Sequence, residues 1–151
     1  MKSEILRVFK RARQSHLEWV VHGARLMVDI DESEAVKPLL CTHCDFGVWY
    51  QTEGRHITKL PGLKRIALYH EDFHLAYKVL YFKKFDRRIL KRERKLFSKR
   101  FNKPADSETT LRDKFKVLKL RYDVLEKEIK ALEKIVSIMN EKLFEKDRIR
   151  V

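Results

Sequence analysis

Residues 44–50 read Cys-Asp-Phe-Gly-Val-Trp-Tyr, and this run decides the fold because its cysteine can share a metal ion with histidines elsewhere in the chain. Downstream, His70 and His74 lie four residues apart, and upstream His16 precedes Trp19 by three. Residues four apart on a helix are about 5–6 Å apart at Cβ, which is close enough to hold one ion. One thiol and three imidazoles would fill a closed tetrahedral zinc site, which binds metal without activating water.

The order His-x-x-Trp, Cys-x-Phe-Gly-x-Trp-Tyr and His-x-x-x-His resembles the bacterial chemoreceptor zinc-binding (CZB) domain over about residues 10–80. The resemblance implies that His16, Cys44, His70 and His74 bind one zinc ion per chain. It also implies a dimer and a role in sensing zinc or the oxidant hypochlorous acid. Members of this family are usually joined to chemoreceptor signalling domains or diguanylate cyclases, so the resemblance implies a part in chemotaxis or second-messenger signalling.

A second ligand set stays open, because Cys41-x-x-Cys44 with His70 and His74 also supplies two thiols and two imidazoles. The separation of about 26 residues between Cys44 and His70 is twice that of zinc fingers. Cys41 is otherwise interpreted as a small buried residue or as a redox partner of Cys44. The remaining histidines are expected to be exposed or in loops, with His43 a candidate for the outer shell: His22, His43 and His56.

The aromatic residues of these motifs are predicted to pack in the core, where they would form a dry shell around the metal: Trp19, Phe46 and Trp49.

Composition favours long, solvated helices and a regulatory protein rather than an enzyme. Charged residues make up 38% of 151 residues and hydrophobic residues 44%, with four Gly and three Pro. No apolar run approaches the ~18 residues of a membrane span, and no secretory signal precedes the first helix. Two cysteines without such a signal indicate reduced thiols and a cytoplasmic location. No phosphate loop, nucleophile elbow or His-Glu-x-x-His occurs, so we expect no catalysis.

The net charge of +13 is concentrated in one segment. Between Lys83 and Lys103, eleven Lys or Arg residues stand against two acidic residues, a net charge of +9. The simplest interpretation is the solvated face of a long helix. Two alternatives are docking of an acidic signalling protein or anionic lipid, and nucleic-acid binding with a purely structural zinc ion.

Periodicity predicts four helices. The first runs from Ser3 to about Asp29, and the second from about Ala35 through Tyr50, with Pro38 in its first turn. A loop over Gln51–Pro61 follows, and then a long helix over Gly62–Phe101. Asp106 or Ser107 is expected to cap the last helix.

The last helix carries apolar residues at steps of four and three for more than four heptads, which indicates a coiled-coil seam. Its members are Leu111, Phe115, Leu118, Tyr122, Leu125, Ile129, Leu132, Val136, Met139 and Leu143. The flanking charges are basic in the first half and acidic in the second: Arg112, Lys114, Lys119 and Arg121, then Glu126, Glu128 and Glu133. Such charges favour antiparallel packing, either with a second copy in a homodimer or with helix 62–101 of the same chain.

The sequence therefore predicts an all-α, antiparallel helical bundle with a long C-terminal coiled-coil helix. We expect residues 1–103 to form the zinc-binding bundle and residues 104–151 the dimerisation helix. The predicted function is a cytoplasmic zinc-binding sensory protein in which zinc occupancy or oxidation of Cys44 controls helix packing and partner binding. A coiled-coil adaptor with structural zinc is a further alternative.

Overall fold

Three long helices follow the apolar periodicities of the sequence in the computed structural model, which describes residues 1–28, 40–57, 60–97 and 108–145. Side chains are described except at 85–97, 108–110 and 145. The long helices are α1 (Lys2–Met27), α3 (Gly62–Phe97) and α4 (Glu108–Ile138). The short elements are η1 (Cys41–His43), α2 (Asp45–Thr52), η2 (Gly54–His56) and α5 (Lys142–Glu145). The fold is all-α, as predicted, with no strand in the described residues.

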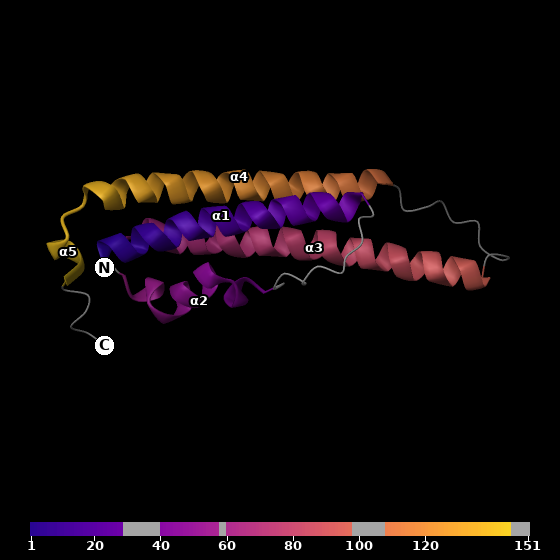
Figure 1. The fold of residues 1–151 in the computed structure, drawn as a ribbon, viewed down its shortest axis with the longest axis horizontal. Coiled ribbons are helices and arrows are strands. Elements are labelled where there is room, and N and C mark those ends of the chain that lie inside the picture. Colours follow the sequence, from indigo (N-terminus) through magenta and orange to yellow (C-terminus); the bar gives the residue numbers. More distant parts are fainter. Residues whose placement is uncertain (29–39, 58–59, 98–107, 146–151) are drawn as a thin grey trace.

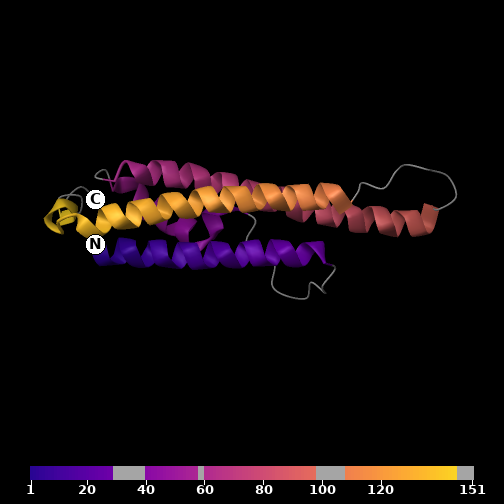
Figure 2. The ribbon, with the colours of Figure 1, turned by 90° about the horizontal axis from the view of Figure 1, so that it is seen from above.

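Helices α1 and α3 lie between α4 on one side and α2 on the other (Figures 1 and 2). Helix α4 runs antiparallel to both α1 and α3, and the C-terminal part of α3 extends beyond its two neighbours. No helix in the described parts of the chain combines the length and apolar character needed to cross a bilayer.

The core is built from one apolar stripe on each long helix. Ile5, Phe9 and Ala12 of α1 are at most 3% exposed, and Phe73 and Tyr77 of α3 are fully buried. The predicted seam of α4 fills the remaining side, with these members buried: Leu111, Leu118, Tyr122, Leu125, Ile129, Leu132 and Val136. The heptad seam of α4 is therefore satisfied inside its own chain.

Ion pairs confirm that α4 packs antiparallel to the other helices. Arg13 of α1 pairs with Glu133 at 2.9 Å and Glu126 at 3.7 Å. Arg65 of α3 lies 2.7 Å from Glu128, and Arg121 lies 3.8 Å from Asp72. The acidic second half of α4 thus meets the basic first turns of α3 and the middle of α1, which is the in-chain option that the charge pattern allows.

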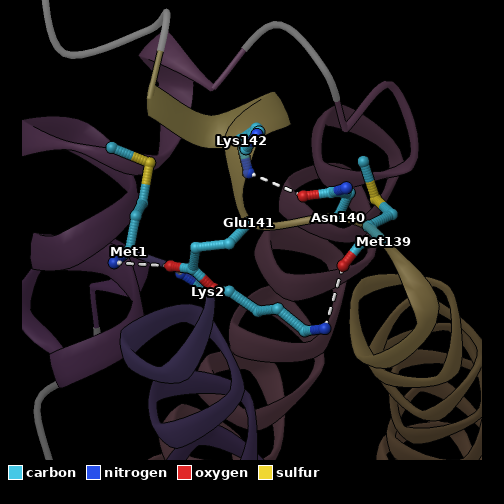
Figure 3. A network of polar contacts seen from close by, with 6 residues as sticks. All are labelled: Met1, Lys2, Met139, Asn140, Glu141 and Lys142. Carbon is cyan, nitrogen blue, oxygen red and sulfur yellow. Dashed lines mark hydrogen bonds and ion pairs between the residues drawn. The ribbon is translucent and has the colours of Figure 1, made fainter.

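The start of α1 closes the end of α4 (Figure 3). The Lys2 ammonium group donates to the carbonyl oxygens of Ser137 at 2.7 Å and Met139 at 2.9 Å. The last carbonyl groups of a helix have no N–H partner within the helix. A cation at this end donates hydrogen bonds to them and interacts favourably with the negative end of the helix dipole. The backbone amide of Lys2 also donates to Glu141 at 3.2 Å.

The predicted second helix over 35–50 is confirmed from Asp45 onward and is wrong at residues 40–44. Residues 41–43 form η1, and Cys44 is extended, with φ −83° and ψ 159°, so it is the N-cap of α2 and not a helical residue. Leu40 and Cys44 therefore do not share a helix face. The predicted loop over 51–61 also begins later, because α2 continues to Thr52 and η2 follows.

The predicted seam of the last helix is wrong at its end. Helix α4 stops at Ile138, and the Asn140 side chain accepts from the amide of Lys142 at 3.1 Å as α5 begins. As a result Phe144 is buried, whereas Leu143 is 45% exposed. Pro38, Phe101 and the capping residues Asp106 and Ser107 lie outside the described residues, and the division at residue 103 stays a prediction.

Candidate metal centre

His16 reaches the core because it continues the buried stripe of α1. It lies four residues after Ala12 and three before Trp19, so all three share one helix face. The side chain is 1% exposed. His16 therefore points into the core of the bundle.

Cys44 is placed by a tight turn of backbone at the start of α2. Its sulfur accepts a hydrogen bond from the amide of Gly47 at 3.4 Å, in the manner of an N-cap side chain. The thiol lies 3.4 Å from the carbonyl oxygen of Cys41. A Cβ atom at Gly47 would lie 1.7 Å from that same carbonyl oxygen, so only glycine lets η1 fold back over the first turn of α2.

His70 and His74 project from successive turns of α3 toward α1 and α2. They are 3% and 2% exposed. Their ring centroids are 4.5 Å apart. The i, i+4 spacing read from the sequence therefore gives two neighbouring imidazoles on one face, as predicted.

The four side chains meet at one buried point. One ligand atom from each of His16, Cys44, His70 and His74 lies within 4.8 Å of the other three. The Cys44 sulfur is 3.0 Å from Nε2 of His70 and 4.0 Å from Nε2 of His16. Three separate segments, α1, the start of α2, and α3, thus contribute donors to a single position.

His74 tests whether a metal fits this position. Both of its ring nitrogens are buried and lack a hydrogen-bond partner among the described residues. A neutral imidazole has one donor and one acceptor nitrogen, and leaving both unpaired in a core is costly. A cation at the centre of the cluster would take the acceptor lone pair, so the donor set fits a metal better than an empty core.

Burial sets the protonation states in favour of metal binding at the imidazoles. It lowers the pKa of His16 to about 4, of His70 to about 2 and of His74 to about 3. Burial also raises the pKa of Cys44 to about 11. The imidazoles are therefore neutral near pH 7 and ready to bind, whereas the thiol must lose a proton to a metal.

Aromatic rings exclude water from the cluster. The centroid of Trp19 lies 4.4 Å from that of His74, and Phe46 lies 4.8 Å from His70. Phe73, which the motifs did not single out for this role, lies 5.2 Å from His16. The predicted dry shell is confirmed for Trp19 and Phe46, and Trp49 is buried beside Phe46 with a centroid separation of 5.9 Å.

The alternative ligand set is not the one that the structure brings together. Cys41 is half-buried in η1 and lies outside the cluster, and His16 occupies the fourth place. His43 and His56 are exposed, as expected. His22, expected to be exposed or in a loop, is instead partly buried within α1. Its Nδ1 lies 2.5 Å from the Tyr77 hydroxyl, a contact that no sequence motif signals.

The basic segment 83–103 begins within α3. Its helical part ends with α3 at Phe97, and the side chains from 85 onward lie outside the described residues.

The family model of the chemoreceptor zinc-binding domain matches residues 16–81, so the resemblance found in the sequence is confirmed. All four clustered residues fall within the match. This domain binds zinc, and the cluster is positioned as a zinc site. It is a sensory and signalling domain and not an enzyme family. Comparisons with curated proteins and with solved structures found no significant match.

Proposed function

We propose that this chain, whose residues 16–81 match a zinc-binding sensory domain, is a cytoplasmic regulatory protein that holds one zinc ion at His16, Cys44, His70 and His74. Zinc occupancy, or the oxidation state of Cys44, sets how the start of α2 packs against α1 and α3. A signalling partner reads that change.

The observation that carries the proposal is the convergence of one thiol and three imidazoles from three segments on one buried point. The thiol and the imidazoles are the donors that zinc accepts, and four protein ligands leave no open position for water. A closed site of this kind fits binding and sensing and does not fit hydrolysis. The absence of catalysis is part of the proposal.

Cys44 is the residue through which the site can respond to oxidants. A thiolate bound to zinc keeps its nucleophilic character, and oxidation of the sulfur removes a ligand. A groove of about 540 Å³ is lined by residues that include Cys41, Tyr50, His70 and Glu71, so it borders one residue of the cluster and is the side from which an oxidant would approach. Both cysteines are free thiols, which fits a reducing compartment.

The first test is metal content and ligand substitution. Purified protein is expected to contain one zinc ion per chain. Replacing His16, Cys44, His70 or His74 with Ala is expected to weaken zinc binding by more than the roughly 10–100-fold that loss of a supporting outer-shell partner costs. Cys41→Ala is the control because Cys41 lies beside the site and outside the cluster. Loss of zinc in Cys41→Ala with retention in His16→Ala would show that the ligand set is wrong.

The second test is oxidation. Treatment of the zinc-loaded protein with hypochlorous acid is expected to release zinc in step with oxygen addition at Cys44, because the oxidised sulfur no longer bonds the metal. Zinc release is followed with a chromogenic chelator and thiol modification by mass spectrometry. The Cys41→Ser variant should behave like the wild type, unless a Cys41–Cys44 disulfide follows the first step. Zinc release with an unmodified Cys44 would refute the redox role and leave zinc binding intact.

A further inference from the structure

The clustered side chains are closed off from solvent, so an ion needs a route to them. All four are at most 6% exposed: His16, Cys44, His70 and His74. Trp19, Phe46 and Phe73 pack against the histidine rings, with centroid separations of 4.4–5.2 Å. A hydrated cation does not cross such an apolar layer, because losing its water without gaining other donors is costly. An ion must therefore approach where polar groups line its path.

The groove of about 540 Å³ beside the cluster provides polar groups of this kind. One of its walls comes from η1 and α2, and the other comes from α3. His70 belongs both to the α3 wall and to the cluster, so the groove borders the cluster at this imidazole. Cys41 belongs to the opposite wall, and its carbonyl oxygen accepts a hydrogen bond from the Cys44 thiol at 3.4 Å.

Two further metal-binding side chains line the groove next to His70, namely Cys41 and Glu71. Cys41 is half-buried and Glu71 is exposed. Burial, and next the negative charge of Glu71, raise the pKa of the Cys41 thiol, which places the carboxylate near the thiol. Within the described residues, the closed cluster is the group of such side chains whose donor atoms meet at one point. Cys41 and Glu71 offer only two donors and would hold an ion weakly.

Charge along the groove distinguishes its two ends. Lys64 lines the groove seven residues before Glu71, which is about 10 Å away along the axis of α3. An ammonium group repels a cation and a carboxylate attracts it, so the end beside His70 is the one that favours a metal ion. Asp72 does not line the groove, and it pairs with Arg121 of α4 at 3.8 Å.

We propose that Cys41 and Glu71 form a transfer site that holds zinc briefly on its way into and out of the cluster. This inference rests on the proposed function, because it assumes a zinc ion at the four clustered residues. The Glu71 carboxylate binds the hydrated ion without losing a proton. The Cys41 sulfur then binds, and its proton passes to solvent. When His70 and Cys44 take over the ion, Cys44 releases its proton and Cys41 regains one, so one proton is released in all.

A transfer site changes how fast zinc exchanges and leaves the affinity alone. A donor held beside the cluster acts at a high effective concentration, so it can take the ion as soon as the first bond to the cluster breaks. A residue that touches the ion only in transit stabilises the transition state of uptake and of release alike. For a sensor, this site would set how quickly zinc occupancy follows the zinc supply.

Rapid-mixing kinetics on the full chain test the transfer site. Release is followed from the zinc-loaded protein into excess chromogenic chelator, and uptake by withdrawal of zinc from a weaker dye. Cys41→Ser and Glu71→Gln are each expected to slow both rates at least about fivefold and to change Kd by less than about twofold, because only the transition state loses a contact. Zinc content and helicity are measured for every variant.

Asp72→Asn is the matched control for Glu71→Gln. It removes a carboxylate from the next residue of α3, outside the groove, so both rates should stay as in the wild type. Cadmium separates bonding by the thiol from simple attraction of cations. The cadmium ion is softer than zinc and favours thiolate sulfur, so Cys41→Ser should slow its uptake more than Glu71→Gln does.

Three results would overturn the proposal. One is unchanged rates in both Cys41→Ser and Glu71→Gln. Another is weaker affinity with faster release, which would make these residues supports of the bound state. The third is equal slowing by Asp72→Asn, which would show a general effect of charge.

The transfer site and the proposed function fail in different ways. A wild type that holds no zinc would refute both. A wild type that holds zinc at the cluster, with rates that do not depend on Cys41 or Glu71, would refute the transfer site alone. Cys41→Ala remains a valid control for zinc content at equilibrium, because a transfer residue changes rates and not the final occupancy.

Discussion

Cys44 is the clustered residue that holds a proton at neutral pH on the atom that would bind the metal. Burial raises the pKa of its thiol to about 11, while it lowers the pKa of His16, His70 and His74 to about 4, 2 and 3. At neutral pH the metal-free site therefore carries one proton that zinc must displace. The imidazoles contribute none.

This protonation state predicts the pH dependence of zinc affinity. Between about pH 6 and 8 the thiol is protonated and the imidazoles are neutral, so zinc binding releases one proton and affinity should rise about tenfold per pH unit. Competition with a chelating dye at several pH values measures the slope. Cys41→Ala should show the same slope, which assigns the proton to Cys44. A slope that steepens toward about a hundredfold per unit near pH 6 would mean that the imidazoles titrate there and are not buried as described.

For single residues, the sequence predicts well which side chains form the cluster. His16, Cys44, His70 and His74 are signalled by residue type, order and spacing, and they do meet. The position of Cys44 on a helix face was wrong, because periodicity says nothing of a residue that caps a helix through its sulfur. The contact of His22 with Tyr77 could not be predicted either, because no sequence motif links these two residues.

Among the elements, the contact between η1 and α2 is the one that positions the thiol. The carbonyl of Cys41 lies against Gly47, and a Cβ there would come within 1.7 Å of its oxygen. Backbone cannot yield to such a contact without moving either Cys41 or the whole first turn of α2. Cys44 lies between these two points, so its sulfur must move with them.

Gly47→Ala is therefore expected to weaken zinc binding at least about tenfold and to lower the melting temperature, although Ala is favoured over Gly in a helix by about 1 kcal/mol. Zinc titration and thermal unfolding measure the two effects. Gly62→Ala is the control, because a Cβ at Gly62 would meet only the Leu132 side chain at 3.4 Å. Unchanged zinc affinity in Gly47→Ala would show that η1 can shift without moving Cys44.

The long elements could be predicted because each has a sustained apolar period. The stripes of α1, α3 and α4 recur at steps of three and four, and the residues on them are buried. The short elements could not, since η1, η2 and α5 hold three or four residues each, too few to show a period. The end of α4 at Ile138 depends on Asn140 and on Lys2, which is distant in sequence.

For the whole molecule, the sequence predicts the bundle but not which surface remains free. A heptad seam has the same pattern whether it packs against its own chain or against a copy, because both partners offer apolar stripes. Ion pairs of α4 with Arg13 and Arg65 show that the seam is used within the chain. The apolar residues beside the seam are 39–64% exposed and stay outside the core: Val117, Leu120 and Val124.

The packing of Trp19 on His74 gives the molecule a built-in optical reporter. The chain has two tryptophans, and both lie in the aromatic layer around the cluster, Trp19 with its centroid 4.4 Å from that of His74 and Trp49 against Phe46. Indole emission depends strongly on the polarity and charge of its immediate surroundings. Tryptophan fluorescence would thus come from the lining of the site and from no distant surface, so occupancy could be followed in real time without attaching a dye.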